Sequence, residues 1–181
     1  MKRIIVLIPI IIGLVINSCS SNDTKTSDTT TYSKGQSLVN DEVSQQNILQ
    51  IAIGSSDHST LVAAVQAADL EDVLANAGPL TVFAPNNAAF EKLPEGVVAD
   101  LLKPENKAKL AHIITYHAAP GKYTGNMIKG VMGIGQATGD KVNVEIVDGE
   151  TFVNGAKIIG TVEASNGVVH VIDSVLLPPE K

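Results

Sequence analysis

His170, Asp173 and Ser174 together supply the three side-chain types of a hydrolytic triad. In an extended strand, however, positions 170 and 173 project to opposite faces, and no Gly-x-Ser-x-Gly turn surrounds Ser174 to expose it as a nucleophile. The valines on either side of His170 favour a histidine inside the core. The sequence therefore predicts a structural His170, an Asp173 that caps or anchors the end of a strand, and no catalytic residue.

His112 and His117 are the two histidines closest together in the chain, five positions apart. On a helix this spacing separates them by about 140°, whereas two histidines that share a zinc ion need the i, i+4 arrangement. The only cysteine, Cys19, lies near the amino terminus. We therefore expect no metal site and no cofactor.

His117 has two interpretations. It follows Tyr116 and lies among apolar residues, and an imidazole in such a setting usually bonds to groups inside the protein. We expect a buried ring, bonded to a backbone carbonyl or to a side chain such as Thr81 or Asn86, that locks a helix to the sheet. The alternative is that His117 contacts a ligand directly.

Residues 130–139 contain four glycines, as phosphate-binding loops often do. The segment lacks the Lys-Ser/Thr ending and the following helix that such a loop requires. We expect a flexible loop instead. Its apolar neighbours could contact a partner: they are Met127, Ile128, Val131, Met132 and Ile134.

The amino terminus has the pattern of a bacterial lipoprotein signal. Lys2 and Arg3 precede an apolar run over 4–16, which is shorter than the roughly 18 to 20 residues that span a bilayer. Cys19 follows an aliphatic residue at −3 and a small residue at −1, which resembles a lipoprotein cleavage box. We expect 1–18 to be removed and the thiol to be acylated. The alternative is an ordinary secretory signal with an incidental cysteine.

Residues 19–46 are expected to form the lipidated cysteine and a flexible polar tether. Serine, threonine, asparagine, aspartate and glutamine dominate this segment, which cannot bury enough apolar surface to fold alone. A chain of this kind reaches roughly 25 to 30 Å. Ser20, which follows the cysteine, resembles the sorting signal of outer-membrane lipoproteins.

The chain is acidic, with 13 basic and 19 acidic residues and a net charge of −6. Removal of Lys2 and Arg3 with the signal leaves a mature charge of about −8. Such a charge repels polyanions, which argues against nucleic acid and against polybasic docking on anionic lipid.

Residues 47–181 have the size of one domain and begin with helical periodicity. A strand over 80–84 must end at Pro85, after which Asn86 or Asn87 can cap a turn of helix. The expected helices cover 59–68, 70–74, the turn with Phe90 and Leu93, 97–102 and 105–114.

The second half alternates with the period of strands. Asp148-Gly149 and Asn154-Gly155 separate runs over 142–147, 151–153 and 156–159, and both pairs are strong hairpin signals. A third pair, Asn166-Gly167, precedes a run over 168–177 that is apolar on both faces. Helices followed by an antiparallel meander predict an α+β fold.

Three stretches, at 81–90 (TVFAPNNAAF), 114–121 (ITYHAAPG) and 166–179 (NGVVHVIDSVLLPP), resemble the motifs of the fasciclin domain family. The resemblance implies a wedge-like β-sandwich with helices along one edge, and a surface module for adhesion. It also implies candidate contact residues: the pair Tyr116 and His117, and Thr161 with Val162, which occupy the positions of an Asp-Ile pair in adhesive animal members. Because that pair is absent here, an integrin partner is not expected.

The leading hypothesis is a lipid-anchored, extracytoplasmic adhesion or binding module of the cell envelope without catalytic activity. Its partner would be a protein or a polysaccharide at the surface. The alternative is a small-molecule carrier or weak enzyme with a pocket near His117.

Overall fold

A computed structural model describes residues 45–179 of the chain. The predicted signal peptide, Cys19 and nearly all of the tether lie outside the described residues. Within them, no helix has the length and apolar character needed to cross a membrane.

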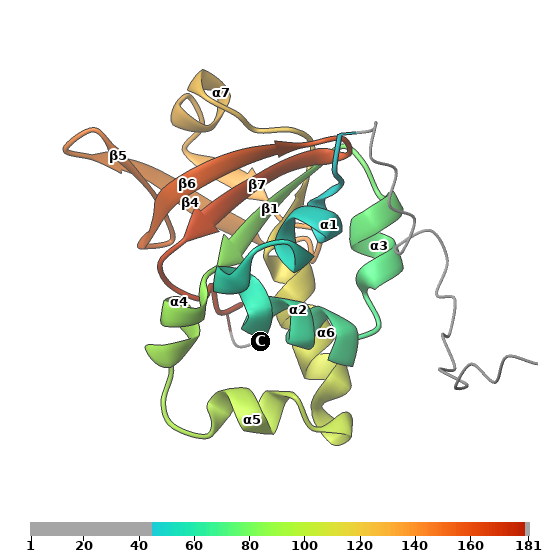
Figure 1. Cartoon of the computed structure of the whole chain (residues 1–181). Coiled ribbons are helices and arrows are strands. Elements are labelled where there is room, and N and C mark those ends of the chain that lie inside the picture. The colour runs from blue at the N-terminus through green and yellow to red at the C-terminus, as the bar shows by residue number, and fades with distance from the viewer. Residues whose placement is uncertain (1–44, 180–181) are drawn as a thin grey trace, which may run out of the picture. The chain divides into compact units, whose positions relative to one another are not determined.

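Helices make up most of the first half of the described chain, as the periodicity predicts (Figure 1). Three were not predicted: α1, which begins at a capping box between Asn47 and Gln50, the short 3₁₀ helix η2, and the short α7. The predicted cap at Ser59 or Thr60 is wrong, because α2 starts at Ser59 and its N-cap residue, His58, makes no side-chain cap hydrogen bond. The helices are α1 (Ile48–Ile53), η2 (Ser56–His58), α2 (Ser59–Ala67), α3 (Glu71–Asn76), α4 (Asn87–Glu91), α5 (Val97–Leu101), η3 (Pro104–Asn106), α6 (Lys107–Tyr116) and α7 (Asn126–Lys129).

Seven strands form one sheet in the order β2-β1-β7-β6-β5-β4-β3. The run from β3 to β7 is an antiparallel meander, which confirms the predicted α+β class. The parallel pairing of β1 with β7 was not predicted. The strands are β1 (Leu80–Pro85), β2 (Ala118–Pro120), β3 (Gly133–Gly135), β4 (Lys141–Val147), β5 (Glu150–Val153), β6 (Ala156–Ala164) and β7 (Gly167–Ile172).

The sheet curls so that its two end strands approach each other. The backbone N–H of Ala137, just after β3, donates to the carbonyl of Ala118 in β2 at 2.7 Å. The layers of the predicted sandwich therefore belong to one bent sheet. Inside the bend lies an apolar core that includes Phe83, Ile134 and Ile172.

A second core lies between the outer face of the sheet and the helices. Val82 and Ala84 of β1 and Val169 of β7 pack there with residues of α1, α2, α3 and α6. Because side chains alternate along a strand, β1 and β7 are buried on both faces, as the doubly apolar run over 168–177 predicts.

The turns Asp148-Gly149 and Asn154-Gly155 are confirmed, and all four of these residues have positive φ, as a type I′ hairpin turn needs. The third predicted pair is displaced by one residue. Ser165 and Asn166 form that turn, and Gly167 is already the first residue of β7.

The predicted loop over 130–139 is partly wrong. Gly133–Gly135 pairs with β4 as strand β3, and Ile134 is almost completely buried in the inner core. Met127 and Met132, by contrast, are exposed.

Candidate functional site

His117 is buried at the end of α6, with only 5% of its surface exposed. Burial lowers the pKa of the ring to about 4, against the opposing effect of its bond to Ile113, so the ring is neutral at pH 7. Nδ1–H then donates to the carbonyl of Ile113 at 2.8 Å, and Nε2 accepts from the N–H of Leu176 at 3.0 Å. Both ring nitrogens are thus occupied inside the protein, which leaves neither for a ligand.

The buried ring of His117, with a bond to a backbone carbonyl, agrees with the prediction, but the side-chain partners named for it, Thr81 and Asn86, are wrong because both are engaged elsewhere. The Thr81 hydroxyl donates to the carbonyl of Gly121 at 2.8 Å and accepts from the N–H of Tyr123 at 2.9 Å. The side-chain oxygen of Asn86 accepts from the N–H of Ala89 at 2.8 Å and caps α4, as predicted. The side chain of His117 therefore connects α6 to the carboxy-terminal segment, whereas its backbone carbonyl accepts from the N–H of Phe83 in β1 at 2.8 Å.

Tyr116 is also withdrawn from the surface, with 1% of its area exposed. Its hydroxyl accepts a hydrogen bond from the side-chain amide of Asn154 at 3.0 Å. Desolvation raises the pKa of the phenol. In this conformation a surface partner cannot reach the side chains of the Tyr116–His117 pair.

A cavity lies beside His117, between α2, α5 and α6. This is the place where a small-molecule carrier or weak enzyme would have its pocket under the alternative hypothesis. It has a volume of only about 40 Å³ and, apart from His117, a wholly apolar lining. Typical small-molecule sites measure roughly 300 to 1,000 Å³. The cavity is too small to hold a drug-sized or sugar-sized ligand without rearrangement.

His170 is buried inside the bent sheet, stacked on Phe83 with ring centroids 5.8 Å apart. Its Nε2 lies 2.7 Å from the carbonyl oxygen of Tyr123 and its Nδ1 lies 2.8 Å from the hydroxyl of Thr161. The carbonyl requires Nε2 to be the donor, so Nδ1 accepts from Thr161. Desolvation lowers the pKa of this ring, against the opposing effect of the bond to Tyr123, which favours the neutral form.

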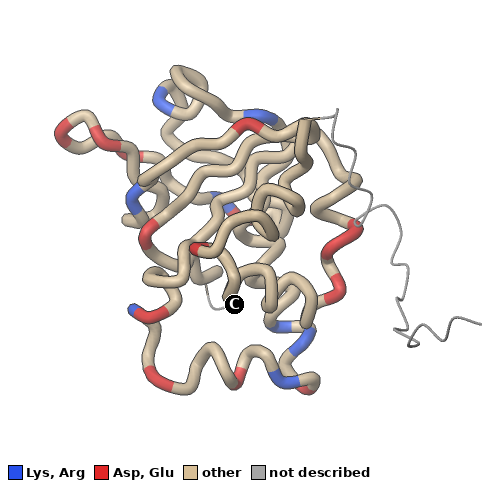
Figure 2. The backbone as a smooth tube through the Cα atoms, in the orientation of Figure 1, with Lys and Arg blue, Asp and Glu red and all other residues tan. Residues whose placement is uncertain are grey.

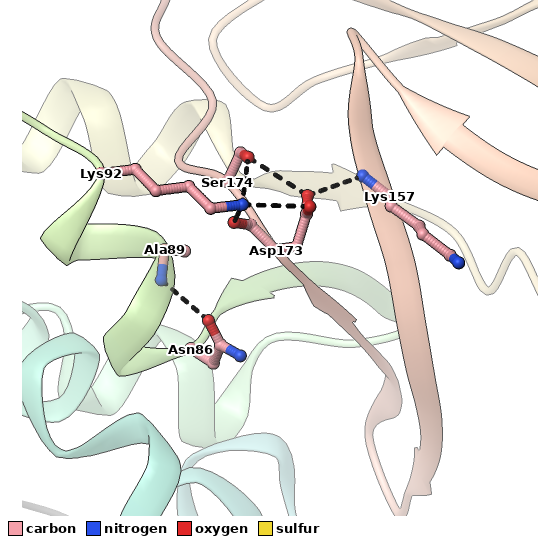
Figure 3. A network of polar contacts seen from close by, with 6 residues as sticks. All are labelled: Asn86, Ala89, Lys92, Lys157, Asp173 and Ser174. Atoms are coloured by element: carbon pink, nitrogen blue, oxygen red, sulfur yellow. Dashed lines mark hydrogen bonds and ion pairs between the residues drawn. The ribbon is translucent and has the colours of Figure 1, made fainter.

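Asp173 and Ser174 belong to a different network, drawn in Figure 3. One oxygen of Asp173 accepts from the N–H of Lys157 at 2.9 Å and from the Ser174 hydroxyl at 3.1 Å, and the other lies 3.1 Å from the ammonium of Lys92. Burial works against ionisation of the carboxyl group, but these hydrogen bonds outweigh it and lower its pKa. Asp173 thus holds the end of β7 against β6 and α4, and its partners do not include His170.

The remaining predicted residues, Thr161 and Val162, lie on an exposed part of β6. Val162 is 42% exposed and Ile159 is 50% exposed. We refer to residues 159–163 as the β6 segment. Thr161 uses its hydroxyl to hold His170, whereas Val162 has its side chain on the opposite face.

Two hollows flank the β6 segment, and Ile159 and Gly160 line both of them. The inner hollow, about 270 Å³, lies between β5, β6 and α7 and has a mixed lining: Lys129, Glu150, Thr151, Thr161 and His170 are polar, and Ile128, Ile158 and Ile159 are apolar. The outer hollow, about 320 Å³, lies between α1, η2 and the outer face of the sheet and is mostly apolar: Ile51, Ala52, Ala84, Val162, Val169 and Val171, with Ser55, Asp57, His58 and Asn86 at one end.

Sequence reasoning did not find Lys129 or Ile159 as members of this site. The predicted strand stopped at Ile159, whereas β6 continues to Ala164. Lys129 reaches the inner hollow only because the segment before α7 crosses the sheet, where Tyr123 bonds both Thr81 and His170. No local pattern in the sequence predicts that this segment crosses the sheet.

Among residues 45–179, no group of three or more histidines, cysteines, aspartates or glutamates is close enough to hold a metal ion.

The profile of the fasciclin domain matches residues 56–178. The chain is 49% identical over 137 residues to protein sll1483 of Synechocystis, covering 75% of this chain and 76% of that protein. It is 40% identical over 112 residues to the cell surface glycolipoprotein MPB83 of Mycobacterium bovis, covering 61% of this chain and 49% of the relative.

Among solved structures, the pair of fasciclin domains from the insect cell adhesion molecule fasciclin I shares the fold, with a TM-score of 0.57. The match has 22% sequence identity and covers 74% of this chain and 51% of the insect protein.

Proposed function

Because the chain belongs to the fasciclin domain family, we propose that it is a binding and adhesion module of the cell envelope, without catalytic activity, held outside the cytoplasm by acyl chains on Cys19. One relative, MPB83, is a cell surface glycolipoprotein, which supports a contact function at the surface. The partner is a protein or polysaccharide, and the mature charge of about −8 disfavours nucleic acid.

The exposed β6 segment with its two hollows is the observation that carries this proposal. Apolar side chains that remain exposed next to a hollowed surface are typical of interaction sites. Val162 and Ile159 supply such side chains, and the hollows beside them are several times larger than the cavity near His117.

The candidate triad residues and His117 are engaged in structural contacts, which supports a non-catalytic role. The rings of His117 and His170 have both nitrogens within hydrogen-bond distance of internal partners. Asp173 and Ser174 bond to each other and to lysines. A general base must reach the proton it removes, and none of these groups faces a hollow with a free nitrogen or oxygen of matched pKa.

The anchoring part of the proposal rests on the sequence around Cys19 and on the relative MPB83, which is described as a cell surface glycolipoprotein. Metabolic labelling with a radioactive fatty acid tests it in intact cells. Incorporation that disappears in Cys19→Ser is the expected result. Labelling that persists in Cys19→Ser, or mature chain found in the cytosol, contradicts it.

Adhesion is tested with the mature chain immobilised on beads and offered to cells and to purified surface material. We expect dose-dependent attachment that falls by about tenfold in Val162→Glu, since a charge in an apolar contact is poorly solvated. Val147→Glu, at a valine of similar exposure on β4, is the matched control. Attachment that is equal in both variants, or turnover of a substrate by the wild type, contradicts the proposal.

A further inference from the structure

We propose that the β6 segment binds an extended segment of a protein partner as an added β-strand. The inference rests on the proposed binding function and states how that function is carried out.

The backbone of β6 is open on one side. β6 pairs with β7 from Ile158 to Ala164, but β5 pairs only with Ala156 and Lys157. An antiparallel strand directs its N–H and C=O groups alternately to its two sides. Within the described residues, the groups of 159–163 that face away from β7 therefore have no partner strand, and no turn or loop backbone bonds to them.

Both ends of this open stretch carry features that oppose further strand pairing. A bulge lies between Ile158 and Gly160, and at the other end Glu163 forms an ion pair with Lys122 at 2.8 Å. Bulges and charges are the usual protection of an edge strand, and here they leave Thr161 and Val162 accessible between them. An incoming strand is thus limited to a short contact with a defined register.

The two hollows provide room for the side chains of an added strand. Successive residues of a strand point to opposite faces, so an incoming segment directs alternate side chains toward the inner and the outer hollow. In binding by strand addition, main-chain hydrogen bonds supply affinity, and pockets for alternate side chains supply specificity. The β6 segment has both elements, since Ile159 and Gly160 line both hollows.

The lining of the hollows indicates the chemistry of the partner. On the outer face the incoming residues meet Val162 and the apolar surface beyond it, which favours aliphatic side chains. On the inner face they meet threonine hydroxyls and Lys129, a cation that has no ion-pair partner among residues 45–179. Glu150 also lines this hollow, but Lys157 neutralises it at 3.2 Å.

The partner segment therefore alternates aliphatic residues with polar residues, one of them acidic. Figure 2 shows lysines in the segment that leads through α7 and acidic residues in the turn between β4 and β5. This distribution places the preferred acid toward α7 and away from Glu150.

A capped hexapeptide of valines alternating with threonine, aspartate and serine tests the inference by NMR on the ¹⁵N-labelled mature chain. We expect shifts in the amides of 160–163 and slower hydrogen exchange there. The same peptide with alternate amides N-methylated removes the strand hydrogen bonds and should not bind. Val162→Lys should weaken binding at least tenfold, because a lysine on an edge opposes strand addition. Val147→Lys, 49% exposed against 42% for Val162, should leave it unchanged.

The charge of the inner hollow has its own test. Lys129→Glu should weaken binding of the aspartate peptide by about tenfold and leave the matching asparagine peptide unaffected. Lys109→Glu, on the exposed side of α6, is the control. An equal effect of Lys129→Glu on both peptides overturns the proposed acid preference.

Other outcomes overturn the proposal itself. Equal binding of the N-methylated peptide does so, and so does an unchanged affinity in Val162→Lys. Dimers of the peptide-free chain that Val162→Lys dissociates identify the occupant as a second copy instead. Attachment to cells without any peptide-induced shift rejects strand addition and leaves the proposed function standing, whereas shifts in β6 without attachment support strand addition and reject the proposed function.

Discussion

The backbone N–H of Leu176 donates to Nε2 of His117 across 3.0 Å, although the two residues are 59 positions apart. The other ring nitrogen bonds the carbonyl of Ile113 within α6. One neutral imidazole therefore fastens the carboxy-terminal segment to the last turn of this helix.

Replacing His117 by alanine should destabilise the domain. The change leaves a buried N–H at Leu176 and a carbonyl at Ile113 without partners, and it opens a cavity next to the one already present. We expect a loss of about 3 kcal/mol, or roughly 10 °C in Tm. Calorimetry measures it, with His112→Ala at an exposed position of α6 as the control. Unchanged melting together with lost partner binding would instead make His117 a contact residue.

Stability should fall when the pH is lowered from 7 to 5. The pKa of His117 is about 4 in the folded state, below the ordinary 6.5, so the unfolded chain binds more protons between these values. Stability is therefore complete above about pH 6.5 and decreases as the pH falls toward 4. His117 alone should contribute about 2 kcal/mol of loss at pH 5.

The depressed pKa values of His58 and His170 act in the same direction as that of His117. Urea unfolding at several pH values measures how the free energy of unfolding changes with pH. His117→Gln should be less stable than the wild type at pH 7, and its free energy of unfolding should change less between pH 7 and 5. If that free energy changes with pH as much as in the wild type, groups other than His117 cause the pH dependence.

Asn166 joins two helices to the sheet through one side chain. Its oxygen accepts from the N–H of Ile48 at 3.0 Å, at the start of α1. Its amide group donates to the carbonyls of Leu74, Ala75 and Ala77 at 2.8, 3.2 and 3.0 Å, at the end of α3. These are the backbone groups that a helix leaves unpaired at its termini.

Asn166→Ala should therefore cost about 3 kcal/mol in the free energy of unfolding. Asn76→Ala, which removes a single exposed bond to Asp72, should cost less than about 0.5 kcal/mol. Chemical denaturation compares the two. Equal losses would show that the hydrogen bonds of Asn166 are replaced by water.

Gly167 should not tolerate a side chain. A Cβ at this position would lie 1.9 Å from the carbonyl oxygen of Leu80, which belongs to the backbone of β1 and cannot rotate away. Gly167→Ala should cost more than about 3 kcal/mol or prevent folding, because the parallel pair of β1 and β7 must separate.

Gly135→Ala is the control for that change, since a Cβ there meets no atom within 4 Å. It should change stability by less than about 1 kcal/mol, as measured by thermal unfolding. A Gly167→Ala protein as stable as this control would mean that β1 and β7 are not so closely packed.

Local patterns in the sequence predicted much of the fold correctly. The apolar period of α6, the proline that ends β1 and the Asp-Gly and Asn-Gly turns depend on neighbouring residues, so they are visible without tertiary structure. The motif at 166–179 is also visible in the sequence, but the prediction that its Asn166-Gly167 pair forms the turn is wrong by one residue. A glycine is needed at position 167 because the backbone of Leu80, which is distant in the sequence, leaves no room for a side chain.

The candidate site was only partly predictable. Thr161 and Val162, which the sequence predicts as contact residues, line the hollows of the proposed site, but Tyr116 and His117 are buried, and Lys129 was missed.

The sequence by itself determined most of the longer helices and the hairpin strands, the α+β order and the likeness to a surface module, because helix period, turn chemistry and motif spacing can be read from short stretches of sequence. The tertiary structure alone decided which partners the histidines have, where β5 separates from β6, and which side chains line the two hollows. Those relationships join segments tens of residues apart, and their free energy depends on burial and on hydrogen-bond geometry that exist only once the sheet has curled.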